Sequence, residues 1–220
     1  MAKTIPMRAG ERDRPHWLPW SAFPFQARFA QIAGKRIHYI DEGSGPALLL
    51  VSAGQWSFMF RDVIVRLRGQ FRCLTLDLPG CGLSPDVPGY DHSVQANAQI
   101  LEGFIDALDL QDITMAVHDV GGPLGFLVAA RRPERFRALV ISNSFGWPLA
   151  DLTVLTLFGR KNDPYGWQSR FAQIFPRATA AGMADGHHFP FNDDPDAYAA
   201  AISAWWAEKV AAADGNPANP

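Results

Sequence analysis

The chain has 220 residues, with 20 Lys and Arg against 22 Asp and Glu, so its net charge is −2 when the histidines are neutral. This length fits one domain with a core of its own, and the small charge argues against a surface built for nucleic acid or anionic lipid. Hydrophobic residues make up 48% and charged residues 19% of the chain, which excludes wholesale disorder.

The N-terminal region shows none of the patterns that direct a chain to a membrane or out of the cell. Residues 1–19 carry charges and prolines but no apolar segment of a signal peptide. No stretch reaches the ~18 apolar residues of a transmembrane helix. Cys73 and Cys81 are too few for a disulfide scaffold and are expected to be reduced thiols. We therefore expect a cytoplasmic protein with no membrane and no nucleic-acid partner.

Strand and helix patterns alternate over residues 25–210, between an irregular proline-rich lead-in (1–24) and a flexible tail (211–220). A hairpin is expected around Ala33-Gly34, because apolar and polar residues roughly alternate on both sides of this turn. The apolar run 47–52 is typical of a strand that is buried on both faces. The later elements are expected as helix 56–67, strand 71–76, helix 92–108, strand 113–117, helix 123–132, strand 136–142, strand 152–158, helix 165–175, strand 178–184 and helix 196–210. Such alternation predicts a mainly parallel sheet covered by helices on both faces, the α/β class.

The turn after strand 113–117 carries the first candidate for chemistry, because ligands and catalytic groups in parallel sheets lie past the carboxyl ends of the strands. The sequence there is His118-Asp119-Val120-Gly121-Gly122, followed by a helix. In a nucleophile elbow, such a sharp turn exposes one side chain above the sheet, and the next backbone N–H acts as an oxyanion donor. Asp119 would be the nucleophile and Val120 the donor. The alternative is that Asp119 only caps the helix.

Two later turns supply partners for such a nucleophile. Asp163 follows strand 152–158, and His187-His188 follow the last expected strand. Nucleophile, acid and histidine thus come in the chain order of α/β-hydrolases. Asn143, after strand 136–142, occupies a competing position for the acid but offers an amide, which favours Asp163.

Five segments, taken in order, carry a resemblance to a known family: 37–43 (IHYIDEG), 56–58 (WSF), 77–84 (DLPGCGLS), 118–122 (HDVGG) and 188–190 (HFP). They resemble the α/β-hydrolase superfamily, specifically its branch of haloalkane dehalogenases and epoxide hydrolases with an aspartate nucleophile. The resemblance covers nearly the whole chain outside the lead-in and tail, and it is more specific for the fold than for the substrate. It implies an α/β-hydrolase fold with a mainly parallel sheet of the eight-stranded type and helices on both faces.

The resemblance implies a two-step hydrolysis of a small apolar substrate, an alkyl halide or an epoxide. Asp119 attacks an electrophilic carbon and forms an ester, and His188 then activates the water that hydrolyses it, with Asp163 orienting His188. His188 is preferred because the family places Phe directly after the catalytic histidine, although His187 stays an alternative. The backbone N–H groups of Ala53 and Val120 would form the oxyanion hole. The mechanism requires no metal and no organic cofactor.

The sequence departs from this family around the leaving group. Ala53 offers a backbone N–H but not the side-chain amide that one dehalogenase group uses to hold the halide. Val120 stands where dehalogenases usually have a halide-binding Trp. Trp56 and Trp147 are candidate replacements, together with Phe145 as a substrate-binding residue, although hydrophobic packing is at least as good an explanation for the two tryptophans.

The cap domain of the family is also missing. Only residues 143–151 (NSFGWPLAD) connect strands 136–142 and 152–158, where relatives insert a helical cap. Phe145, Trp147 and Leu149 should therefore be exposed, which makes the uncapped face a candidate surface for a homodimer. Two functions follow as hypotheses: a hydrolase that acts through an Asp119 ester, or a weak or inactive capless core that serves as a binding or structural protein.

Overall fold

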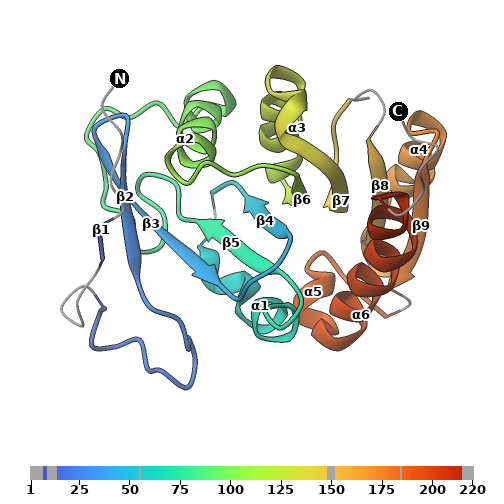
Figure 1. The fold of residues 1–220 in the computed structure, drawn as a ribbon, viewed down its shortest axis with the longest axis horizontal. Coiled ribbons are helices and arrows are strands. Elements are labelled where there is room, and N and C mark those ends of the chain that lie inside the picture. The colour runs from blue at the N-terminus through green and yellow to red at the C-terminus, as the bar shows by residue number, and fades with distance from the viewer. Residues whose placement is uncertain (1–6, 9–13, 55, 148–151, 184, 215–220) are drawn as a thin grey trace.

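A computed structural model describes residues 7–8, 14–54, 56–147, 152–183 and 185–214, and it shows a twisted sheet flanked by helices (Figure 1). The described strands are β1 Met7–Arg8, β2 Arg28–Ile32, β3 Lys35–Glu42, β4 Ala47–Ser52, β5 Arg72–Leu76, β6 Ile113–Asp119, β7 Phe136–Ser144, β8 Thr153–Gly159 and β9 Ala178–Met183. They form one nine-stranded sheet in the order β1-β2-β3-β5-β4-β6-β7-β8-β9. The first four strands in this order pair antiparallel, and the pairs from β5 to β9 are parallel.

This sheet confirms the predicted α/β-hydrolase fold. Strands β2 to β9 correspond to the eight expected, and the ninth, β1, is a two-residue strand that pairs with β2 from within the lead-in. The predicted hairpin is formed by β2 and β3, with Ile32 opposite Lys35 around a turn in which Ala33 and Gly34 both have positive φ.

The helices cover both faces of the sheet (Figure 1). They are α1 Arg61–Leu67, α2 Val94–Ala107, α3 Gly121–Arg131, α4 Trp167–Ile174, α5 Pro190–Asp193, α6 Pro195–Trp205 and α7 Ala212–Asp214. Figure 1 shows α2 and α3 on one face and α1, α5 and α6 on the other. None of the described helices is both long and apolar enough to cross a membrane.

Alternate side chains of the central strands enter two separate cores. In β4, Leu49 and Val51 pack with α2 and α3, whereas Leu48 and Leu50 pack with α1 and α6. Successive side chains of a strand point to opposite faces, so a strand buried on both sides must be apolar throughout. This explains why the run 47–52 reads as continuously apolar.

Several helices differ from the expected bounds by a few residues, among them α2 and the C-terminal helix. Helix α2 begins at Val94 and not at residue 92, because the Ser93 hydroxyl accepts a hydrogen bond from the Ala96 N–H and so caps the helix. At the C-terminus, helical structure continues from α6 through a π-helical segment, Trp206–Ala211, to Asp214. The first four residues of the expected tail are therefore helical, and residues 215–220 lie outside the described part.

The connection from β7 to β8 is short for two neighbouring parallel strands. It comprises residues 145–152, of which 148–151 are not described, whereas parallel neighbours are usually joined by a dozen or more residues with a helix. Phe145 and Trp147 are each 41% exposed at the start of this connection, as predicted for a core without a cap. Leu149, the third residue expected to be exposed, lies outside the described residues.

Candidate active site

The turn between β6 and α3 holds Asp119 in an uncommon backbone conformation. Asp119 has φ of 50°, in the left-handed region, and the β6–β7 ladder shifts register between His118 and Asp119. A non-glycine residue in this region costs of order 1 kcal/mol and is retained only where the surroundings impose it. The side chain of Asp119 remains 29% exposed. The turn therefore has the geometry of a nucleophile elbow.

Two glycines allow the helix to start this close to the sheet. A Cβ on Gly121 would collide with the backbone of Val51 and Ser52 in β4, and one on Gly122 would collide with the Ser144 side chain at the end of β7. The hydroxyl of Ser144 also donates a hydrogen bond of 2.6 Å to the Asp119 carbonyl. Close backbone contact from both sides thus imposes the conformation of Asp119.

His188 reaches this aspartate from the loop after β9. Its Nε2 lies 3.1 Å from Asp119 Oδ2, and its side chain is 36% exposed. The ring is flanked by Phe189, with ring centres 4.8 Å apart, and by the buried His118, at 4.9 Å. His187, the alternative base, is exposed, and its backbone N–H donates to the Asp193 carboxylate at 2.6 Å. The structure thus brings His188, and not His187, to the elbow.

His118 is a buried neutral neighbour of this pair. Its Nδ1–H donates to the Ser142 carbonyl at 3.0 Å. Burial, followed by the proximity of His188, lowers the pKa of His118 to about 4. A group with this pKa carries no charge at neutral pH, so His118 adds no positive charge beside His188.

The expectation that Asp163 orients His188 is wrong. Both carboxylate oxygens of Asp163 accept hydrogen bonds from the first turn of α4, from the Trp167 N–H at 2.7 Å and the Gln168 N–H at 3.0 Å. The first N–H groups of a helix have no acceptor within the helix, and they engage this carboxylate. His188 Nδ1 instead faces the side-chain amide of Asn162, with Nδ2 at 2.9 Å.

Asn143, the competing position for the acid, binds the backbone of Asn162 and not its side-chain amide. Its Nδ2 donates to the Asn162 carbonyl at 2.8 Å, and its Oδ1 accepts from the Gly159 N–H at 2.8 Å. Asn143 is buried and has φ of 37°, which asparagine tolerates better than most residues. Sequence reasoning missed Asn162, and no motif in the sequence singled it out.

The two proposed oxyanion donors lie at the same edge of the sheet as Asp119. Ser52 pairs with His118 in the parallel β4–β6 ladder, so Ala53 and Asp119 are the next residues along their strands. Val120 precedes the first turn of α3, where backbone N–H groups have no intrahelical acceptor. The placement fits an oxyanion hole, and the role of both groups stays a prediction.

Trp56, a candidate for halide binding, belongs to an aromatic cluster with Phe58 and Trp17. Its ring stacks on Phe58, with ring centres 4.7 Å apart, and meets Trp17 edge-on at 5.8 Å. Its indole Nε1 is buried and has no hydrogen-bond partner among the described residues. These ring contacts are typical of hydrophobic packing, and the halide-binding role of Trp56 stays a prediction.

Phe145 and Trp147 remain candidates for contact with a substrate because they are partly exposed. The Phe145 ring lies 6.3 Å from that of Trp167, and the Trp147 ring meets Phe126 edge-on at 6.1 Å. Both residues leave the carboxyl end of β7, next to the strand that ends in Asp119.

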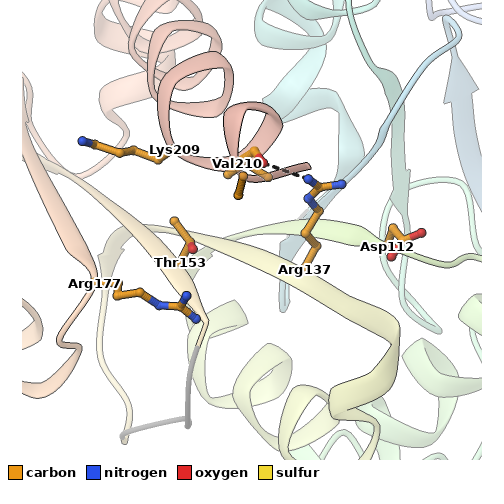
Figure 2. Close-up of a pocket in the computed structure, with 7 residues that line it drawn as sticks. Asp112, Arg137, Thr153, Arg177, Lys209 and Val210 are labelled. Atoms are coloured by element: carbon orange, nitrogen blue, oxygen red, sulfur yellow. Dashed lines mark hydrogen bonds between the residues drawn. The ribbon is translucent and has the colours of Figure 1, made fainter. Parts of the chain in front are cut away.

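A polar pocket of about 250 Å³ lies at the opposite edge of the sheet (Figure 2). Three of its residues stand at the amino ends of strands: Asp112 before β6, Arg137 in β7 and Thr153 in β8. The guanidinium of Arg137 donates to the Val210 carbonyl at 2.8 Å, as Figure 2 shows. This pocket is separate from Asp119 and His188, which follow the carboxyl ends of the strands. Among the described residues, no three His, Cys, Asp or Glu side chains are grouped so that they could hold a metal ion.

Comparisons with known proteins agree with this fold. Residues 44–192 match the family described as the alpha/beta hydrolase fold. The chain is 39% identical over 139 residues to haloalkane dehalogenase 2 of Mycobacterium tuberculosis, which covers 63% of this chain and 48% of that protein. It is 39% identical over 138 residues to a cis-3-alkyl-4-alkyloxetan-2-one decarboxylase of Shewanella oneidensis, which covers 61% of this chain and 43% of that protein.

The chain thus spans about half the length of these curated relatives. Among solved structures, a haloalkane dehalogenase from Agrobacterium tumefaciens superposes with a TM-score of 0.75 at 16% identity, covering 83% of this chain and 96% of that chain. At this level of sequence identity, the superposition supports the fold alone.

Proposed function

Because the chain belongs to the α/β-hydrolase fold family, we propose that it is a hydrolase of the haloalkane dehalogenase type with Asp119 as its nucleophile. The observation that carries the proposal is the pair formed by Asp119, on its strained elbow, and His188, with 3.1 Å between Oδ2 and Nε2. A helix cap, the alternative role for Asp119, would require neither the positive φ nor a histidine at this distance.

In the first step, a carboxylate oxygen of Asp119 attacks the alkyl carbon. The new C–O bond forms as the carbon–halogen bond breaks, and the halide leaves with the bonding electron pair. A carboxylate suits this step because it is ionised at neutral pH, and no proton has to move. In the second step, water attacks the ester carbonyl carbon and gives its proton to His188. Backbone N–H groups hold the tetrahedral oxyanion, and its collapse breaks the bond between the carbonyl carbon and the alkyl oxygen. The leaving alkoxide takes the proton from His188 and departs as the alcohol, and the Asp119 carboxyl then loses its own proton to solvent.

An alkyl halide is favoured over an epoxide by the short connection between β7 and β8. A halide leaves as a stable anion, whereas an opening epoxide oxygen needs a proton donor. The resemblance assigns this donation to tyrosines of the cap, and residues 143–151 contain no tyrosine. The open site also leaves water available to solvate the departing halide.

The test is to incubate the protein with reactive alkyl bromides and to search for an alkyl ester by mass spectrometry. Halide release is measured alongside, and peptide mapping locates the added mass. We expect the adduct on Asp119 and a longer-lived adduct in His188→Ala, which lacks the general base. An epoxide and an oxetan-2-one belong in the panel, because the relative from Shewanella is named for the latter.

A folded protein that gives no adduct and no halide with any member of the panel would contradict the proposal. That result is the one expected from the alternative, a capless core that only binds a partner or only folds. A cooperative thermal melt of the same sample establishes that the protein was folded.

A further inference from the structure

We propose that Asn162 is the positioning residue of His188, and that its amide makes hydrolysis of the Asp119 ester the slow step of the reaction. The ester then accumulates on Asp119 during turnover. This inference rests on the proposed function, because it concerns the fate of the ester that Asp119 forms.

A continuous line of contacts joins the three side chains. Asp119 Oδ2 lies 3.1 Å from His188 Nε2, and His188 Nδ1 lies 2.9 Å from Asn162 Nδ2. The backbone of Asn162 is held in turn by Asn143, whose Nδ2 donates to the Asn162 main-chain carbonyl at 2.8 Å. Asn143 also binds the Gly159 N–H at the end of β8, so the position of Asn162 is fixed by two strands.

The contact between Asn162 and His188 decides which nitrogen of the imidazole carries the proton. When Nδ2 faces the ring, it donates to His188 Nδ1, and the proton of the neutral ring sits on Nε2. Nε2–H then donates to Asp119 Oδ2, which leaves Oδ1 free to attack an alkyl carbon. The alkylation step therefore proceeds with the hydrogen bonds already in place.

The hydrolytic step needs the opposite tautomer. His188 Nε2 must accept a proton from the attacking water, so the proton of the neutral ring must sit on Nδ1 and Asn162 must turn its Oδ1 toward it. Even then the amide carries no charge to stabilise the imidazolium. In a protease with a Ser-His-Asp triad, changing the aspartate to asparagine lowers kcat about 10⁴-fold.

The three carboxylates nearest to this site in the segments after β8 and β9 are engaged elsewhere. Asp163 binds the first turn of α4 through both oxygens. Asp185 pairs with Lys161 at 3.2 Å, and Asp193 accepts from the His187 N–H. The nearest ionisable ring, His118, is neutral at pH 7 because burial holds its pKa at about 4. Asn162 is therefore the group that contacts His188 Nδ1.

The experiment compares the wild type with Asn162→Asp, using an alkyl bromide that alkylates Asp119. The samples are quenched at increasing times and analysed for adduct and bromide. The wild type should release one bromide per protein rapidly and then slow down, with most molecules carrying the ester. Asn162→Asp should lose this burst and turn over at least about 10-fold faster in the steady state, within the 10⁴-fold range of a triad carboxylate.

Two further variants separate positioning from a structural role. Asn192→Asp adds the same charge at an exposed position of α5 and should behave as the wild type. Asn162→Ala removes the amide and should still form the ester, which should then decay more slowly than in the wild type. The acid limb of the pH–rate profile should move to higher pH only in Asn162→Asp, because a carboxylate there favours the protonated ring.

Two results would overturn the inference in different ways. An ester that forms on Asp119 but decays at the same rate in the wild type, Asn162→Asp and Asn162→Ala removes Asn162 from the reaction and leaves the proposed function standing. The absence of an ester in every folded variant removes the proposed function and the inference together. If Asn162→Asp does not fold, the decay rate in Asn162→Ala decides the question.

Discussion

The turns after β6 and β8 each carry an aspartate, but only the one after β6 directs its carboxylate to the site. Asp119 stands at a backbone with φ of 50° and faces His188, whereas Asp163 is turned toward the N–H groups of α4. The first turn is held by backbone contacts of two glycines, which no side chain can replace. The second turn is held by side-chain hydrogen bonds. There Asn162 faces His188, and its neighbour Asp163 binds α4. An aspartate that follows a parallel strand can therefore be assigned to a catalytic site only when the hydrogen-bond donors around its carboxylate are known.

Replacing each of the two aspartates by asparagine should give the largest difference, which we expect in the rate of halide release. Asp119→Asn should abolish the ester and lower halide release by at least about 10³-fold, because the nucleophile is lost, while asparagine still accepts the left-handed backbone. Asp163→Asn should leave halide release within about 3-fold of the wild type, because Asp163 acts on α4 and not on His188. Bromide release under saturating substrate measures both. Equal losses in the two variants would contradict the distinction between the turns.

Adding a side chain where α3 lies against β4 should have the next largest effect, which we expect on the free energy of unfolding. In Gly121→Ala, the new Cβ meets the Val51 carbonyl and the Ser52 backbone, so we expect the free energy of unfolding to fall by about 3 kcal/mol. Gly69→Ala is the matched control, because nothing lies within 4 Å of its Cβ. Urea unfolding of both variants is the measurement. Equal free energies of unfolding for Gly121→Ala and Gly69→Ala would show that α3 can move away from β4 at no cost.

The elbow should also make stability depend on pH through His118. Burial, with a smaller effect of His188, lowers its pKa in the folded state from 6.5 to about 4. Well above pH 6.5 His118 is neutral in both the folded and the unfolded state, and as the pH falls toward 4 the unfolded chain takes up the proton first. This group should therefore remove about 2 kcal/mol of stability between pH 7 and pH 5.

The variant His118→Gln isolates this contribution. Its free energy of unfolding should fall less than that of the wild type over the same pH interval, because the other titrating groups are common to both proteins. Urea titrations at pH 7, 6 and 5 give the comparison. Parallel pH dependences would mean that His118 takes up its proton equally in the folded and unfolded states.

Removing the carboxylate that binds the first turn of α4 should have the smallest effect. Asp163→Ala takes two acceptors from the first turn of this helix, which should lower the free energy of unfolding by about 1 kcal/mol. Asp163→Asn retains one acceptor oxygen and should lose less. Thermal melts rank the three proteins. A stability equal to that of the wild type in Asp163→Ala would show that solvent replaces the carboxylate at no cost.

The part of this site that could be predicted from the sequence is the part that local patterns control. The apolar run of β4, the turn 118–122 with its glycines and the order of the later loops follow from side-chain periodicity and from backbone freedom at glycine. These features placed Asp119 on an elbow and His188 after the last strand. The same patterns predicted the exposure of Phe145 and Trp147, because the connection that precedes β8 is too short for a cap.

Only the tertiary structure decided which group supports the histidine and what surrounds the indole of Trp56. Asn162 and Asp163 are neighbours in the chain, and the choice between them depends on Asn143 from β7 and on the free N–H groups of α4. Trp56 contacts aromatic rings that include Trp17, which lies 39 positions earlier in the sequence. A difference of one residue in a loop leaves the periodic pattern unchanged, so the hydrogen bonds between distant segments determine the outcome.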